Sequence, residues 1–243
     1  MGDSSTRVRG CVGRDGSLPS TAVRHGSASI RNGHRPKATL VLLVRHGRTA
    51  TTGRILPGRA PGLHLAEAGL REAETVAARI ARMPGVAAVY SSPLERARET
   101  ADRIGAARGL AVVVDPDLSE CDSGAWTGAE LRALAKKPEW RIVQHHPSGF
   151  RFPAGESFPE MQARVTAAVT RLVASHPGQA VVAVSHADPI KAAVAQALGT
   201  PLDLFQRIMV DTASVTAIAY RPVGPTVLTV NSTGGDLPML HRR

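Results

Sequence analysis

Five charged or polar side chains stand at or soon after the ends of short apolar runs. They are Arg45, His46, Arg96, Glu120 and His186. Arginine presents a planar fork of N–H donors that matches two phosphate oxygens, and it keeps its charge at every physiological pH. The two arginines therefore predict a pocket for a phosphoryl group.

A histidine inside such a pocket can act as a nucleophile. Positive neighbours disfavour the imidazolium form, so the ring stays neutral and keeps a nitrogen lone pair that can attack phosphorus. The leaving alkoxide then needs a proton, which a carboxylic acid at the pocket edge can supply before it activates water. Glu120 suits that role, and the five residues together predict phosphoryl transfer.

The elements that must bring these residues together alternate between short apolar strands and helices. Strands are predicted over residues 39–44, 86–92, 111–115, 179–186, 214–220 and 226–232, and helices over 69–83, 92–109, 127–135, 157–175 and 187–199. This alternation is typical of parallel strands joined by crossover helices, with ligands bound outside the carboxyl ends of the strands. We therefore expect an α/β protein, a three-layer α/β/α sandwich with a mostly parallel central sheet.

One helix start carries a local signal. Ser92 and Glu95 have the spacing of a capping box, and Pro93 would take the first helical position. This pattern predicts a helix that begins directly after the second strand and carries Arg96 one turn in.

The first 38 residues differ from the rest of the chain. Seven basic and two acidic residues give this segment a net charge of +5, half of the +10 of the whole chain. It is rich in Gly, Ser and Arg and shows neither helical nor strand periodicity. We expect a disordered basic N-terminal extension over 1–38, or an over-called start site, before a catalytic domain over 39–243. A transit peptide is the less favoured alternative for this segment. The second Arg-His-Gly triplet, around His25, lies in this segment and is read as chance.

Composition limits the remaining classes of protein. The hydrophobic fraction of 43% suits one large globular domain, and no apolar run approaches the length of a membrane helix. Two cysteines, Cys11 and Cys121, cannot build a disulfide framework or a zinc site unaided, which indicates a reducing compartment. We therefore expect a cytoplasmic protein without a membrane partner.

The motifs that hold the five residues resemble those of a known family. LLVRHGRT, YSSPLERARET, LSECDSGAWTG, FPAGES and VSHADPIK occur in the order and spacing of the histidine phosphatase superfamily, in its phosphoglycerate-mutase-like branch. The resemblance covers residues 39 to about 193 and implies a phosphoglycerate-mutase-like fold. It implies that His46 is the phosphoryl acceptor, that Arg45, Arg96 and His186 hold the phosphoryl group, with His186 also counted as catalytic, and that Glu120 is the general acid.

Several positions depart from the family pattern. Thr52 replaces the usual asparagine and is expected to bind phosphate more weakly, while Arg54 and Arg59 bracket the place of a substrate-contacting arginine. Ala187 replaces the usual glycine after His186 and is counted with those arginines as a substrate-binding candidate. Asp188 could repel doubly charged substrates or cap the helix that Pro189 begins, and we favour the cap.

Rival functions rest on weaker patterns. The adjacent pair His145-His146 could suggest a metal hydrolase, but neighbouring histidines point in different directions and are read as loop residues. A nucleic-acid partner is not expected, because aromatic residues make up only 3% of the chain and the concentrated basic charge lies in the first 38 residues.

Within this family the chain could be a phosphatase, which transfers the phosphoryl group to water, or a phosphomutase, which transfers it back to a substrate. A mutase must shield its phosphohistidine from water, and the segment available for a lid, residues 130–153, is short. We expect a phosphomonoester hydrolase for small phosphorylated metabolites that works without a metal or cofactor. A phosphoglycerate-mutase-type phosphomutase stays open as the alternative, and so does a homo-oligomeric state.

Overall fold

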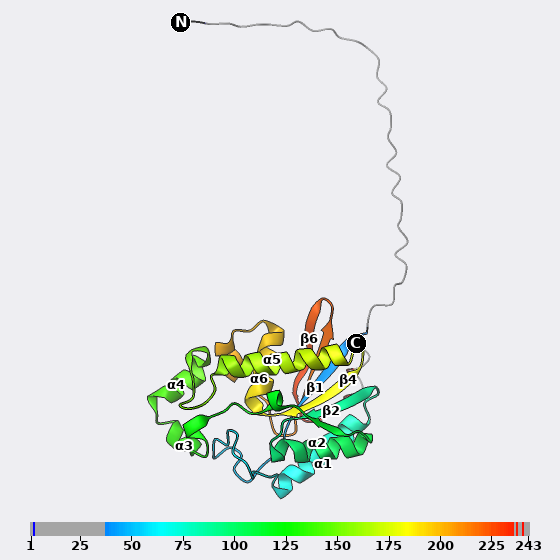
Figure 1. The fold of residues 1–243 in the computed structure, drawn as a ribbon, viewed down its shortest axis with the longest axis horizontal. Coiled ribbons are helices and arrows are strands. Elements are labelled where there is room, and N and C mark those ends of the chain that lie inside the picture. The colour runs from blue at the N-terminus through cyan, green and yellow to red at the C-terminus, as the bar shows by residue number, and fades with distance from the viewer. Residues whose placement is uncertain (1, 3–36, 236, 238–239, 241–243) are drawn as a thin grey trace. The chain divides into compact units, whose positions relative to one another are not determined.

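The computed structural model describes residues 37–235, together with Gly2, Leu237 and Leu240 (Figure 1). The predicted disordered extension over 1–38 falls almost entirely outside the described residues, as does His25. The fold below is therefore that of the predicted catalytic domain.

A six-stranded sheet forms the centre of this domain, in the order β3-β2-β4-β1-β5-β6. The strands are β1 (Thr39–Arg45), β2 (Val86–Ser91), β3 (Val112–Val114), β4 (Ala180–Ser185), β5 (Val215–Arg221) and β6 (Gly224–Ser232). The first four strands are mutually parallel where they pair, whereas β5 runs antiparallel to β1 and β6 runs antiparallel to β5. The prediction of a mostly parallel sheet is confirmed.

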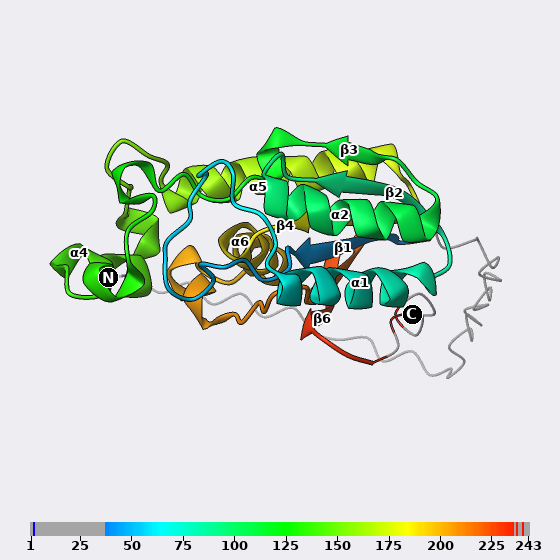
Figure 2. The same cartoon turned by 90° about the horizontal axis from the view of Figure 1, so that it is seen from below.

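Helices cover both faces of the sheet. They are α1 (Glu67–Ala81), α2 (Glu95–Arg108), α3 (Leu131–Leu134), α4 (Pro138–His145), α5 (Phe158–Ser175) and α6 (Ala187–Leu198). Figure 2 shows α1 and α2 in front of the sheet and α5 behind it. The three-layer sandwich expected from the alternation of strands and helices is thus confirmed.

The central strand β1 is apolar on both sides because each side faces a different core. Val41 and Leu43 pack in one cluster with residues of α5 and α6, whereas Leu40, Leu42 and Val44 pack in a second cluster with residues of α1 and α2. All five are at most 4% exposed. A strand buried on both faces reads as a continuous apolar run, which is the pattern seen in TLVLLV.

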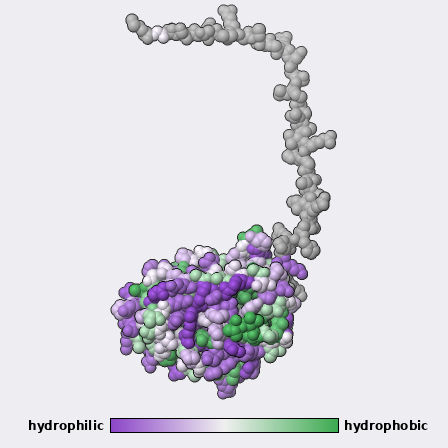
Figure 3. Space-filling model, in the orientation of Figure 1, coloured by the Kyte–Doolittle hydropathy of each residue, from purple (hydrophilic) through white to green (hydrophobic). Residues whose placement is uncertain are grey.

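The face of the domain drawn in Figure 3 is mostly polar. In the view of Figure 3 hydrophilic side chains predominate, with an apolar area on the same face. Among the described residues the exposed large hydrophobic side chains are Val113, Val114, Ile142, Leu198, Met209 and Val223. No helix in this part of the chain combines the length and apolar character that crossing a bilayer requires.

Two sequence predictions about the helices between residues 92 and 146 are wrong. The capping box at Ser92 does not form, because α2 begins at Glu95 with Leu94 as its N-cap and without a side-chain cap. The Ser92 hydroxyl accepts from Leu94 N at 3.3 Å and lies 2.8 Å from Nε2 of His186, while Glu95 accepts from Gly62 N at 3.0 Å. Ser92 and Glu95 therefore bond to His186 and Gly62, which are distant in the sequence, and do not cap the helix.

The second error concerns the segment from 127 to 146. One helix was predicted over 127–135 and a loop at His145-His146, but the structure has a single helical turn, α3, followed by α4, which ends at His145. Pro138 is the first residue of α4. Trp140 and Val143 lie on the side of this helix that packs against the core, and the ring centroids of Trp140 and Trp126 are 6.3 Å apart. Both helices lie at one end of the domain, on the left in Figure 1.

Candidate active site

The site forms where three parallel strands end side by side. Because β4 lies between β1 and β2, the residue that follows each strand bonds to its neighbour: His46 N donates to Ser185 O at 3.0 Å, and Ser92 N donates to Val184 O at 2.9 Å. His186 directly follows β4. Strand pairing therefore places His46, Ser92 and His186 at one edge of the sheet, as the order of elements predicts.

The two histidines form a buried pair. Their ring centroids are 5.1 Å apart with an interplanar angle of 59°, and the residues are 4% and 0% exposed. Nδ1 of His46 lies 2.7 Å from Gly47 O. A carbonyl oxygen can only accept, so Nδ1 carries the proton and Nε2 of the neutral ring keeps the free lone pair.

The surroundings keep both rings neutral. Burial is the largest cause that lowers the pKa of His46 well below its ordinary value, and the charges of Arg96 and Arg45 act in the same direction. Burial followed by the charge of Arg96 lowers the pKa of His186 in the same way. A neutral His46 can offer a lone pair to phosphorus at physiological pH.

Arg96 is fully buried, and some of its guanidinium N–H groups have no hydrogen-bond partner among the described residues. Its Nη2 donates to Gly58 O at 2.9 Å, whereas its buried Nε and Nη1 have no hydrogen-bond partner among the described residues. Arg45 donates Nη1 to Val210 O at 2.7 Å, and its buried Nε is likewise without a partner there. Buried donors are normally satisfied, so unpaired guanidinium N–H groups beside a neutral histidine fit the oxygens of an anion.

Glu120 follows a short 3-10 turn, η1 (Pro116–Leu118), which Ser185 of β4 holds by donating Oγ to Leu118 O at 2.7 Å. Burial, and then the negative charge of Asp188, raise the pKa of Glu120 to about 7, against the opposing effect of Arg96. A carboxyl with this pKa is partly protonated at neutral pH and can give or take a proton.

Three further residues were predicted to bind phosphate or substrate, and the structure shows the following surroundings for Thr52, Arg54 and Ala187. Thr52 Oγ1 accepts from Thr49 N at 2.9 Å and lies 3.0 Å from the Thr49 hydroxyl, so both of these side-chain contacts are with a residue of its own loop. Arg54 is exposed and donates to Ala50 O at 2.6 Å. Ala187 is the first residue of α6 and is half-buried. Their binding roles stay predictions.

The two remaining candidates have other partners. Arg59 donates Nε to Glu120 O at 2.9 Å and Nη2 to Glu156 at 3.1 Å, so it supports the turn that carries Glu120. Asp188 was expected to cap α6, and that is wrong: His186 is the N-cap, and Asp188 sits in the first turn, where it pairs with Lys191 at 3.3 Å. The helix itself begins at Ala187, the start of the predicted range 187–199, and Pro189 lies in its first turn.

Sequence reasoning missed several residues that hold the site. Ser92 bonds to His186, and Thr100 Oγ1 accepts from Gly47 N at 3.1 Å. Glu156 and Arg164 contact the turn that carries Glu120. The FPAGES motif contains Glu156, and the YSSPLERARET motif contains Ser92 and Thr100, so both motifs were signals for these residues, whereas none of the motifs contains Arg164.

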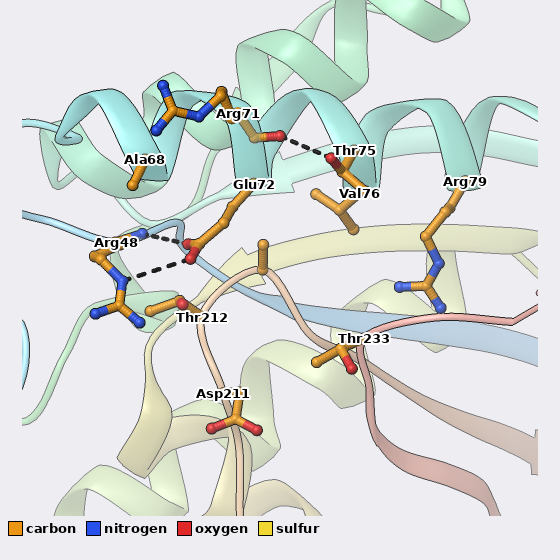
Figure 4. Close-up of a pocket in the computed structure, with 11 residues that line it drawn as sticks. Arg48, Ala68, Arg71, Glu72, Thr75, Val76, Arg79, Asp211, Thr212 and Thr233 are labelled. Atoms are coloured by element: carbon orange, nitrogen blue, oxygen red, sulfur yellow. Dashed lines mark hydrogen bonds and ion pairs between the residues drawn. The ribbon is translucent and has the colours of Figure 1, made fainter.

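A separate cavity of about 560 Å³ is lined mainly by residues of α1 and of the loop after β1 (Figure 4). Its described lining includes Arg48, Glu72 and Arg79 but none of the site residues discussed above. Glu72 accepts from Arg48 N at 2.8 Å and pairs with its guanidinium at 3.6 Å. This cavity therefore lies between α1, the loop after β1 and residues 211–213, and neither His46 nor His186 lines it.

Comparisons of sequence agree with this geometry. The model of the histidine phosphatase superfamily (branch 1) matches residues 41–233. The chain is 38% identical over 206 residues to "Bifunctional protein Rv2228c" of Mycobacterium tuberculosis, a match that covers 83% of this chain and 56% of that protein. It thus spans little more than half the length of that relative. It is 32% identical over 184 residues to "Probable phosphoglycerate mutase GpmB" of Yersinia pestis, covering 74% and 85% of the two chains.

Comparisons of structure find the same fold in phosphatases. Mycobacterial glucosyl-3-phosphoglycerate phosphatase Rv2419c superposes with a TM-score of 0.72 at 27% identity, over 81% of this chain and 100% of that one. A variant of phosphoserine phosphatase from Entamoeba histolytica, in complex with phosphoserine, gives a TM-score of 0.72 at 25% identity, over 80% and 98%. With the superfamily model matched over nearly all of the described domain, the chain belongs to the histidine phosphatase superfamily.

Proposed function

We propose that this protein hydrolyses small phosphomonoesters through a phosphohistidine at His46. The observation that carries the proposal is the neutral His46 ring, 5.1 Å from His186, beside the buried and incompletely paired guanidinium of Arg96. A neutral nucleophile beside unpaired cationic donors suits a phosphoryl group that carries negative charge.

The reaction has two steps in this proposal. Nε2 of His46 attacks phosphorus while the bond from phosphorus to the ester oxygen breaks, and Glu120 gives its proton to that oxygen. Glu120 then takes a proton from water, the oxygen of that water attacks phosphorus, and the bond from phosphorus to Nε2 breaks to release inorganic phosphate. Arg45, Arg96 and His186 stabilise the charge on the phosphoryl oxygens in both steps.

Substrates with an alkyl leaving group fit this scheme. Two similar structures carry the names of glucosyl-3-phosphoglycerate phosphatase and phosphoserine phosphatase, and both names describe alkyl phosphates. The likeness to "Probable phosphoglycerate mutase GpmB" supports the alternative, a phosphomutase that uses the same phosphohistidine. Hydrolysis is favoured because the segment available for a lid, residues 130–153, is short and consists of two short helices and a 3-10 turn.

A screen of phosphorylated metabolites, run with and without 2,3-bisphosphoglycerate as a primer, tests the proposal. We expect phosphate release without the primer and an acid-labile phosphoprotein on rapid quenching. His46→Ala should abolish both, whereas His25→Ala, in the matching triplet, should leave both unchanged. Because arginines neutralise the phosphoryl oxygens, activity should survive EDTA. Primer-dependent transfer without phosphate release would identify a mutase, and equal activity of the two histidine variants would refute the proposed nucleophile.

We further propose a cytoplasmic location and a small-molecule partner only. Cys121 is a buried free thiol, and burial is the largest cause that raises its pKa, so it is held in its protonated form. A free thiol is compatible with a reducing compartment. Fractionation of the native host, with a cytosolic marker enzyme as reference, checks this assignment.

A further inference from the structure

The FPAGES motif (residues 152–157) has no part in the two chemical steps, yet its glutamate belongs to an enclosed ion pair. Arg164 of α5 donates Nε to Glu156 Oε1 at 2.6 Å and Nη2 to Glu156 Oε2 at 2.9 Å. The two side chains are only 16% and 12% exposed. A bidentate pair of this kind fixes the orientation of the guanidinium plane.

The same guanidinium also holds the backbone that leads to Glu120. Nη1 donates to Asp117 O at 2.7 Å and to Ser119 O at 2.8 Å, and Nη2 donates to Glu120 O at 2.9 Å. One side chain thus binds three carbonyl groups of a four-residue stretch. Lysine could not reproduce this, because an ammonium is a point charge without a planar fork.

Glu156 holds the residues on the other side of Glu120. Its Oε2 accepts from Asp122 N at 3.3 Å, and its own backbone N–H donates to Asp122 O at 2.9 Å. The carboxylate of Glu120 itself accepts from Cys121 N at 3.0 Å, a bond within the same turn. The position of the carboxyl group therefore follows from how firmly the backbone of residues 117–122 is held.

We propose that Arg164, oriented by Glu156, is a positioning residue that holds the turn 117–122 so that Glu120 can protonate the leaving group. The assignment rests on the proposed function, in which Glu120 is the general acid. Arg59 assists from the loop side by donating to Glu120 O and to Glu156. Displacing a reacting group by about 1 Å can cost about 10²-fold in rate, so a residue that touches no substrate can still control the protonation step.

Arg164→Lys tests the proposal while keeping the positive charge beside Glu156. We expect kcat/KM for glycerol 2-phosphate, an alkyl phosphate, to fall about 10–100-fold, and that for 4-nitrophenyl phosphate to change less than about threefold, because nitrophenolate leaves without a proton. Arg171→Lys is the matched control: Arg171 lies on the same helix and contacts the side chains of Asp115 and Asp117, but it makes no bond to the backbone of Glu120. An equal loss on both substrates, or no loss, would overturn the proposal.

Two further measurements separate positioning from a general effect on the fold. In the Glu120→Gln background, Arg164→Lys should cost almost nothing more on glycerol 2-phosphate, since a residue that acts through Glu120 cannot add to its removal. An additive loss would assign Arg164 another role. If Arg164→Lys folds poorly, Arg164→Gln with Glu156→Gln removes both charges together and serves for the same comparison.

Amide hydrogen exchange provides a readout that needs no turnover. Exchange should accelerate in the peptide covering 117–124 in Arg164→Lys and stay unchanged there in Arg171→Lys. If wild-type protein hydrolyses neither substrate, the proposed function fails, and exchange alone then decides whether Arg164 holds the turn. Unchanged exchange in Arg164→Lys would overturn the inference whatever the activity.

Discussion

At the scale of single residues, one hydrogen bond decides which atom of His46 can react. Because Gly47 O accepts from Nδ1, the lone pair of the neutral ring lies on Nε2. Burial and two arginine charges keep the ring neutral, while burial and Asp188 keep Glu120 partly protonated. Burial thus favours the neutral form of both groups, which is the form that the proposed nucleophile His46 and the proposed acid Glu120 each need.

The first residue-scale prediction separates the acid from the nucleophile. Glu120→Gln should slow hydrolysis of an alkyl phosphate by about 10²–10⁴-fold, the usual range for general acid catalysis, and slow an aryl phosphate far less. His46→Ala should lose both substrates alike, since no phosphoryl acceptor remains. Steady-state kcat/KM on the two ester types measures this, and an equal loss on both in Glu120→Gln would remove Glu120 from the role of acid.

The second residue-scale prediction concerns pH. Because Glu120 titrates with a pKa of about 7 and must be protonated to donate, alkyl phosphate turnover should fall as the pH rises above about 7. Asp188→Asn removes a negative charge that raises this pKa, so the alkaline limb should move to lower pH. The control Asp203→Asn, whose partner is His146, should leave the limb in place.

Profiles of kcat/KM against pH check the shift. An aryl phosphate should lack this limb altogether, because its leaving group needs no proton. A limb that stays in place in Asp188→Asn, or that moves to higher pH, would contradict the assignment of Asp188 as the charge that raises the pKa of Glu120.

At the scale of elements, the loop after β1 is held between two helices by a close approach of backbones. A Cβ atom on Gly47 would lie 2.4 Å from Gly69 O, at the start of α1, and Gly47 N donates to Thr100 of α2. The close packing of the loop after β1 against α1 therefore depends on the absence of a side chain at position 47.

This approach makes Gly47→Ala a test of the junction. The added methyl group meets backbone and not a flexible side chain, so the loop must shift, at a cost of about 1–3 kcal/mol in the free energy of unfolding. Chemical denaturation measures the loss, and phosphatase activity should fall because His46 moves with the loop. Gly234→Ala, where a Cβ meets nothing within 4 Å, is the control and should unfold like the wild type.

At the scale of the whole molecule, the two cores lie within the catalytic domain. Their buried members run from Leu40 to Leu237, on the two faces of one sheet. A domain that contains its own cores is expected to fold without segments beyond them.

Deletion of residues 1–37 should therefore leave the melting temperature and the phosphatase activity close to those of the full chain. Thermal unfolding and turnover of 4-nitrophenyl phosphate, measured on both proteins in the same buffer, check this. A marked fall in melting temperature on truncation would show that the N-terminal segment contributes to the fold.

Features that depend on residues close together in the sequence could be predicted, whereas features that depend on distant residues could not. Strands were recognisable because a central strand such as TLVLLV is apolar on both faces, and the polar residues that end β1 and β4 identified the histidine site once a parallel order was assumed. The family motifs then supplied roles for residues that spacing alone leaves open. The helix α4 was missed because eight residues with one buried face give little periodic signal.

By itself, then, the sequence determined the alternation of strands and helices, the carboxyl edge where chemistry could occur, and the residues brought there. Only the tertiary structure decided the protonated nitrogen of His46, the diversion of Ser92 from a helix cap to His186, and the support of Glu120 by Arg164. The physical reason is distance along the chain. Strand and helix patterns arise from the local periodicity of the backbone, whereas hydrogen bonds, burial and charge depend on partners that only folding brings together.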